Sequence, residues 1–106
     1  MKIYISLPIT GYDLQERKQY AENVRIRLQQ IYPDGEIITS FDVCPDSSFP
    51  YEVLIGNDIA AILSCDAFYV CKDSSHSKGC RLEYYAALIY GIIIARNGDL
   101  GIKIEP

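Results

Sequence analysis

The sequence has a single histidine, His76, and no C-x-x-C pair among its four cysteines. Cys44, Cys65, Cys71 and Cys80 stand 21, 6 and 9 residues apart, which fits neither a zinc cage nor a thioredoxin-like redox pair. We therefore expect free thiols and no metal. The first three cysteines should be buried and inert. Cys80 falls in the first turn of a predicted helix, where the helix dipole favours a thiolate.

Basic residues are also scarce, since 10 Lys and Arg stand against 14 Asp and Glu and the net charge is −4. No basic surface is expected to neutralise a polyphosphate backbone, which excludes a nucleic-acid polymer as partner. No apolar run approaches the roughly 20 residues of a membrane span. The N-terminal residues MKIYIS lack the basic and long apolar regions of a signal peptide. We therefore expect a cytoplasmic protein that does not bind membranes.

Internal repeats, linkers and low-complexity tracts are absent as well. With 106 residues, 49% apolar and 23% charged, the chain is predicted to form a single domain over residues 1–106.

Short apolar runs alternate with helical patterns. Strands are predicted over 2–6, 36–39, 67–71 and 91–95, with a short edge strand over 101–105. Helices are predicted over 13–31, 51–64 and 78–90. The first begins with the capping-box pattern of Asp13 and Glu16, and its apolar stripe comprises Tyr20, Ala21, Val24, Leu28 and Ile31. This order predicts an α/β fold, a three-layer αβα sandwich with a parallel, flavodoxin-like (Rossmann-type) sheet of 4–5 strands.

Sheets of this kind bind ligands beyond the carboxyl ends of their strands, where the strand order reverses. Three segments should meet there: LPITG (7–11), the long polar loop over 40–50 and KDSSHS (72–77). A long loop in a compact domain is often a binding element.

Asp58 falls on the apolar stripe of its predicted helix, one turn from Leu54 and Ile62. A buried charge is costly there unless it is paired with another polar group or takes part in binding or catalysis. Asp58 is either a helix-edge aspartate bonded to a neighbouring loop or part of a functional site.

Glu83 lies one turn after Cys80 and one turn before Ala86 and Ala87, beside small residues that leave open space. It is either solvated at a helix edge near Arg81 or a nucleophile. A carboxylate that attacks carbon must be ionised yet poorly hydrated, and a site near a helix N-terminus favours both conditions.

Ser77 is the expected N-cap of the same helix, and the N–H groups of Lys78, Gly79 and Cys80 would form an anion pocket. Gly79 would leave room for a ligand to approach closely.

Tyr4 should point to the opposite face of its strand from Ile3 and Ile5. It could donate its hydroxyl to a carboxylate on an adjacent βα unit, although simple packing explains most tyrosines.

Three segments carry a family resemblance: K-I-Y-I-S-L-P-I-T-G at the start, N-D-I-A-A-I-L-S-C-D-A in the middle and S-x-G-x-x-x-E-Y-Y-A-A later. In order and spacing, residues 1 to about 95 resemble the nucleoside 2-deoxyribosyltransferase superfamily, especially its small members, which are related to nucleoside 5′-monophosphate N-glycosidases. In that family a glutamate attacks the anomeric carbon and forms a glycosyl-enzyme ester. The resemblance implies that Glu83 is this nucleophile, that Tyr4 orients it and that Asp58 helps handle the base.

The residue six positions before the nucleophile bears on the substrate. Family members that act on free nucleosides tend to carry aspartate there, whereas those that hydrolyse 5′-monophosphates carry a serine that contacts phosphate. This chain has Ser77, and the turn Ile9, Thr10 and Gly11 would supply further backbone donors. Lys78 adds a positive charge that suits phosphate, or is an ordinary solvated lysine. His76 is a surface residue or a proton donor.

The sequence therefore predicts cleavage or transfer at the N-glycosidic bond of a nucleoside 5′-monophosphate or nucleoside, with no cofactor. The alternative is a non-catalytic nucleotide-sensing module of the same fold. The resemblance also implies a homo-oligomer, because the family's enzymes have a longer C-terminal segment that reaches a neighbouring subunit's site. This chain has only RNGDLGIKIEP in that position.

Overall fold

A five-stranded sheet forms the centre of the computed structural model, which describes residues 1–46, 48–96 and 102–103. The strands lie in the order β2-β1-β3-β4-β5. Their bounds are Lys2–Ser6 (β1), Glu36–Thr39 (β2), Ala67–Val70 (β3), Ile93–Arg96 (β4) and Ile102–Lys103 (β5). The first four are parallel, and β5 runs antiparallel to β4. The predicted parallel, flavodoxin-like sheet is confirmed; the remainder of the predicted edge strand over 101–105 lies outside the described residues.

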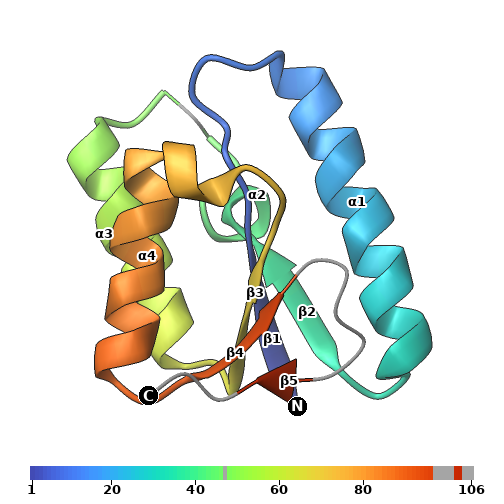
Figure 1. The fold of residues 1–106 in the computed structure, drawn as a ribbon. Helices are drawn as coiled ribbons and strands as arrows, with labels where there is room; N and C mark the ends of the chain where they lie inside the picture. Colours follow the sequence, from blue (N-terminus) through green and yellow to red (C-terminus); the bar gives the residue numbers. More distant parts are fainter. Residues whose placement is uncertain (47, 97–101, 104–106) are drawn as a thin grey trace.

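Helices cover both faces of this sheet, as the three-layer prediction requires (Figure 1). Helix α1 (Leu14–Ile31) packs on one face. Helices α3 (Tyr51–Leu63) and α4 (Lys78–Ile89) lie side by side on the other. Two short elements interrupt segments that were predicted to be loops: α2 (Ser40–Val43) and the 3₁₀ turn η1 (Ser74–His76). Helix α2 forms because Thr39 caps it, accepting from Phe41 N while Asp42 accepts from Thr39 N.

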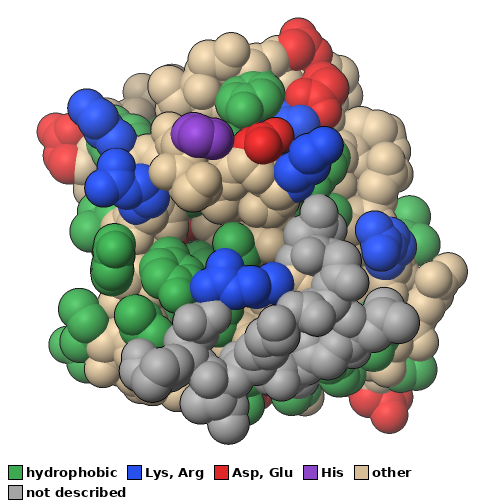
Figure 2. All heavy atoms as spheres, in the orientation of Figure 1, with side chains coloured by type: hydrophobic (Ala, Val, Ile, Leu, Met, Phe, Trp, Pro, Cys, Tyr) green, Lys and Arg blue, Asp and Glu red, His purple; other side chains and the backbone are tan. Residues whose placement is uncertain are grey.

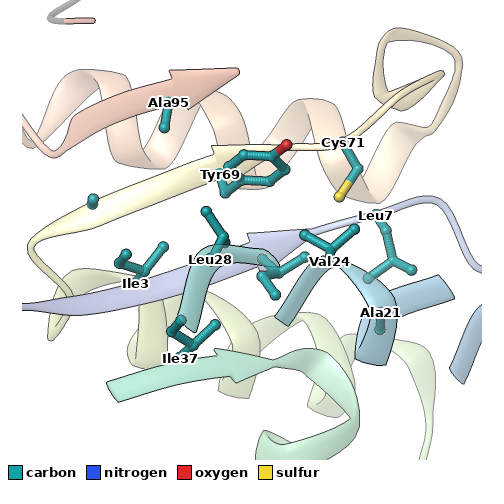
Figure 3. Close-up of a cluster of buried hydrophobic side chains, with 11 residues drawn as sticks. Ile3, Leu7, Ala21, Val24, Leu28, Ile37, Tyr69, Cys71 and Ala95 are labelled. Atoms are coloured by element: carbon teal, nitrogen blue, oxygen red, sulfur yellow. The ribbon is translucent and has the colours of Figure 1, made fainter. Parts of the chain in front are cut away.

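The layer between α1 and the sheet is a continuous apolar cluster (Figure 3). Ala21, Val24 and Leu28 of the predicted stripe are buried against Ile3 and Ile37 among others. Burying a side chain such as Leu28 or Ile3 contributes about 1.5–3 kcal/mol. The two ends of the stripe are less buried than its middle: Tyr20 is half-buried, and Ile31, the last helical residue, is exposed.

The N-terminus of α1 forms half of the predicted capping box. Asp13 accepts a hydrogen bond from Glu16 N at 2.9 Å. The Glu16 carboxylate pairs with Arg17 instead of returning to the cap. Just before this start, Gly11 adopts φ +87°, a left-handed conformation that glycine tolerates best, so the β1–α1 loop can turn tightly over the end of the sheet.

The second apolar layer, under α3 and α4, includes Tyr4. The alternation predicted for β1 is confirmed: Ile3 and Ile5 belong to the cluster on the α1 face, and Tyr4 to the cluster on the opposite face. The Tyr4 ring stacks on Phe68 of the adjacent strand, with centroids 5.9 Å apart and planes 11° from parallel. This stacking fixes the direction in which the buried Tyr4 hydroxyl points.

The strand order reverses at β1, because the chain passes from β1 to β2 on one side and then crosses to β3 on the other. The loops after β1, β2 and β3 therefore meet at one edge of the sheet, where the N-terminal end of α4 also lies.

Candidate active site

Glu83 is buried on α4, with 5% of its surface exposed. Each of its carboxyl oxygens accepts a hydrogen bond from β1: Tyr4 Oη donates to Oε2 at 3.2 Å, and Ser6 Oγ donates to Oε1 at 2.8 Å. The alternative of a solvated helix-edge glutamate near Arg81 is therefore wrong. Two hydroxyl donors hold the carboxyl group in one orientation, which a reacting group requires.

Asp58 of α3 is the second buried carboxyl group in this site, also 5% exposed. Its Oδ2 accepts a hydrogen bond from Ser40 Oγ of α2 at 2.9 Å, so Asp58 is bonded to a neighbouring segment, as one of the two alternatives held. Its Oδ1 is buried and has no hydrogen-bond partner in the described parts of the chain. A buried acceptor without a partner is rare in folded proteins, and here it lies beside a cavity.

The two carboxyl groups perturb each other. Burial and then the negative charge of Asp58 raise the pKa of Glu83 to about 8, against the opposing hydrogen bond from Ser6. Burial also raises the pKa of Asp58, although its hydrogen bond from Ser40 opposes the change. Near neutral pH the pair therefore holds one proton between two carboxyl groups. The pKa of Tyr4 is raised well above its usual value, by burial first and then by Glu83, so Tyr4 remains a hydrogen-bond donor.

An inner cavity of about 130 Å³ opens onto this pair at the carboxyl ends of the strands. Tyr4, Asp58 and Glu83 line it together with four of the predicted ligand-binding residues, Ile9, Thr10, Ser77 and Gly79. An outer cavity of about 370 Å³ adjoins it and shares Thr10, Tyr51, Ser77 and Gly79. The two cavities together offer room for a ligand larger than the inner one alone could hold.

Ser77 is the N-cap of α4, as predicted, and its Oγ accepts a hydrogen bond from Cys80 N at 3.2 Å. Gly79 was expected to face only a ligand, but it also faces the Tyr51 side chain. A Cβ atom at this position would lie 2.9 Å from the Tyr51 hydroxyl oxygen, so the missing side chain makes room for Tyr51 as well as for a ligand. Tyr51 lines both cavities and is 54% exposed.

Two predicted ligand residues do not line the inner cavity. Lys78 lines the outer cavity, where it is exposed beside His76. Gly11 lines neither cavity; its positive φ gives it a role in turning the loop. Gly11 is therefore not placed to donate to a ligand in either cavity. Its contribution is to shape the loop that carries Thr10.

The prediction that Cys80 is a thiolate is wrong. Cys80 is 4% exposed, and burial raises the pKa of its thiol. Loss of hydration outweighs the helix dipole at this position. All four cysteines are free; Cys65, Cys71 and Cys80 are buried, whereas Cys44 is half-buried.

Ser6, Ser40 and Tyr51 belong to the site although sequence reasoning did not select them. The sequence pattern could have indicated two of them, Ser6 and Ser40. Ser6 is two residues after Tyr4 and therefore shares its strand face, and Ser40 directly follows β2 at the edge where a site was expected. Tyr51, at the start of α3, gave no such signal.

A family model described as a domain of unknown function, DUF4406, matches residues 1–96. The chain belongs to this family. The matched region of this DUF4406 chain includes all the residues of the site described above. No curated protein matches the chain.

One solved structure resembles the DUF4406 chain closely in fold. It is a 2-deoxyribosyltransferase from the psychrotolerant bacterium Bacillus psychrosaccharolyticus, described as a biocatalyst for nucleoside synthesis. The TM-score is 0.69 at 17% sequence identity, and the similarity covers 95% of this chain and 77% of that chain. At this identity the likeness establishes the shared fold.

Among the described residues of this DUF4406 chain, no group of three or more His, Cys, Asp or Glu side chains could hold a metal ion. The described helices are also too short or too polar to cross a membrane.

Proposed function

We propose that the chain cleaves or transfers at the N-glycosidic bond of a nucleoside 5′-monophosphate, or of the nucleoside, through a covalent glycosyl-Glu83 intermediate. One observation carries the proposal: a buried glutamate with a hydroxyl donor on each carboxyl oxygen stands next to a second buried carboxyl group in one cavity. The fold likeness to a 2-deoxyribosyltransferase supports it.

The chemistry requires one carboxylate and one acid, and a pair that holds a single proton offers both. In the first step a Glu83 oxygen bonds to the anomeric carbon as the bond from that carbon to the base nitrogen breaks. The base leaves with the electron pair and takes the shared proton, which Glu83 passes to Asp58 before it attacks. In the second step water, or another base, attacks the same carbon and releases the Glu83 carboxylate. The proton lost by the attacking water returns to the pair.

Tyr4 and Ser6 act as positioning residues in this scheme. Their hydroxyls stabilise the ionised form of Glu83 and so oppose the effect of burial on its pKa. The unpartnered Asp58 Oδ1 is the atom best placed to meet a polar group of the base, because Oδ2 is already held by Ser40.

The phosphate is proposed to lie at the N-terminus of α4, where Ser77 and Gly79 line both cavities and Lys78 lines the outer one. The Cys80 N–H already donates to Ser77 Oγ, so the N–H groups of Lys78 and Gly79 are the ones proposed to meet the anion. In this arrangement the sugar faces the carboxyl pair while the phosphate faces the outer cavity.

The decisive experiment incubates the protein with a panel of ribo- and deoxyribonucleoside 5′-monophosphates and measures the released base by chromatography. We expect release from at least one member, and exchange onto an added second base if the enzyme is a transferase. Reversible binding without release of base from any member would contradict the proposal and support a nucleotide sensor.

Replacing Tyr4 with Phe should slow base release by about fivefold. The change removes one hydrogen bond to Glu83, worth about 1 kcal/mol, while the stacked ring on Phe68 stays. Stability should fall by a similar amount. Tyr90→Phe is the matched control, since Tyr90 is 70% exposed and remote from the site. A Tyr4→Phe enzyme as fast as the wild type would reduce Tyr4 to core packing.

Replacing Ser77 with Asp should shift the ligand preference from monophosphate towards nucleoside. Aspartate caps a helix as well as serine does, so the fold should be kept. A unit charge pair about 4 Å apart is worth roughly 4 kcal/mol at an effective dielectric of about 20, and a quarter of that already weakens monophosphate binding about fivefold. Calorimetric titration with a nucleoside and its monophosphate measures the ratio of the two affinities.

Ser77→Asn is the neutral control for this experiment, because asparagine also caps the helix but adds no charge. Its affinity ratio should stay near that of the wild type. If Ser77→Asp leaves the ratio unchanged, the phosphate is not bound at this end of α4.

A further inference from the structure

A separate cavity of about 250 Å³ lies between α4, η1 and the carboxyl ends of β3 and β4. Figure 2 views this side of the molecule, where the surface is hollowed beside hydrophobic side chains and a basic one. Among its described lining residues, Cys80 alone also lines the inner cavity. Ser6 lines it as well, and the Ser6 hydroxyl bonds to Glu83.

Aromatic rings form much of its lining. Phe68 is 1% exposed and fixed by its stack on Tyr4. The Tyr84 ring lies 6.5 Å from Phe68 with a tilt of 59°. Tyr85 meets Tyr84 edge-on at 5.6 Å. These rings present flat apolar surfaces of the kind that hold another planar ring.

The charged residues of this cavity are all basic. Arg81 and Arg96 line it, and no Asp or Glu does so within the described parts of the chain. The Arg96 guanidinium lies 5.4 Å from the centre of the Tyr84 ring and donates to the Tyr84 hydroxyl at 3.1 Å, so it is held in place. This lining is unusual in a chain of net charge −4 whose neighbouring cavity contains two carboxyl groups. A guanidinium pairs with planar and tetrahedral anions through two parallel hydrogen bonds.

We propose that this cavity is a second ligand site, which takes a small planar aromatic anion. The ring of the ligand lies against Tyr84 and Tyr85, and its carboxylate or phosphate pairs with Arg81. A volume of about 250 Å³ suits a single substituted ring. The proposal does not rest on base release by Glu83, because the two cavities are distinct.

The test titrates the full chain calorimetrically with 2-aminobenzoate, phenyl phosphate and the neutral 2-aminobenzamide. We expect saturable binding of at least one of the two anions, at least about tenfold tighter than that of the amide. The carboxylate and phosphate probes distinguish the two kinds of anion. Arg81→Met should weaken anion binding about tenfold. Arg27→Met should not, since Arg27 is also exposed but lies on α1, across the sheet.

Amide resonances of the wild-type protein, followed by NMR during the same titrations, locate the probe without any substitution. Shifts should gather at Ser75, Arg81 and Tyr85. Shifts centred on Thr10 and Tyr51 would place the probe in the active-site cavities and overturn the proposal. It would equally be overturned if no probe binds up to about 10 mM, if the amide binds as well as the anions, or if Arg81→Met binds like the wild type.

Discussion

Glu83→Gln is expected to abolish release of base, by a factor on the order of 10⁴ or more, because an amide cannot attack the anomeric carbon. The substitution is nearly isosteric with the protonated carboxyl group. One of the two hydroxyls of Tyr4 and Ser6 can still donate to the amide oxygen, and the other, which can also accept, faces the amide NH2, so the fold and substrate binding should be kept. Base release measured by chromatography, together with calorimetric affinity for the same nucleotide, separates loss of chemistry from loss of binding.

Glu36→Gln is the matched control for that experiment, since Glu36 is exposed at the start of β2 and lies far from the cavity. It should react at the wild-type rate. Turnover by Glu83→Gln at more than a small fraction of the wild-type rate would exclude a mechanism in which Glu83 is the nucleophile, and another group would then have to be sought.

The same substitution should change how stability depends on pH. Glu83 ionises near its ordinary pKa of 4.5 in the unfolded chain, but its pKa in the folded protein is about 8. Its contribution to stability is therefore fully present below pH 4.5 and is lost as the pH rises to about 8, at up to about 1.4 kcal/mol per pH unit. Glutamine does not titrate. Glu83→Gln should therefore become more stable than the wild type by a margin that grows over this range, reaching several kcal/mol.

Urea unfolding of both proteins at a series of pH values measures this margin. Titrating groups that do not interact with Glu83 cancel in the difference, whereas Asp58 is coupled to Glu83 and is part of the effect measured. Glu36→Gln, at an exposed position away from the cavity, is the control for the substitution itself. Parallel stability curves for the wild type and Glu83→Gln would mean that the Glu83 carboxyl is not held protonated by its surroundings.

Most of the architecture could be predicted because each element carries its own local pattern. Continuous apolar runs marked β1 and β3, and helical spacing of apolar residues marked α3 and α4. Helix α2 was missed because its four residues lie in a polar stretch, where the Thr39–Asp42 capping box was the available signal. An element this short has no periodicity to detect.

The chemistry of the site was harder to predict, because it depends on distances across the fold. The strand pattern placed Ser6 on the same face as Tyr4, but nothing local indicates that its partner is Glu83, 77 residues later. Cys80 was assigned a lowered pKa from the helix dipole, which can be read from sequence, whereas the burial that raises it depends on tertiary packing. Gly79 was expected to leave open space, yet its neighbour Tyr51 comes from a different helix.

The place of Tyr51 also bears on how such a site can diverge. Tyr51 lines both active-site cavities, but it stands at the first turn of α3 with 54% of its surface exposed, outside the buried core. The carboxyl groups of α3 and α4, by contrast, are buried, and hydroxyls of β1 and α2 hold them by hydrogen bonds. Substitution of Tyr51 can therefore enlarge or reshape the space available to a substrate at little cost in stability. In the proposed function, the side chain that shapes the space for a substrate is therefore separate from the carboxyl pair that reacts with it.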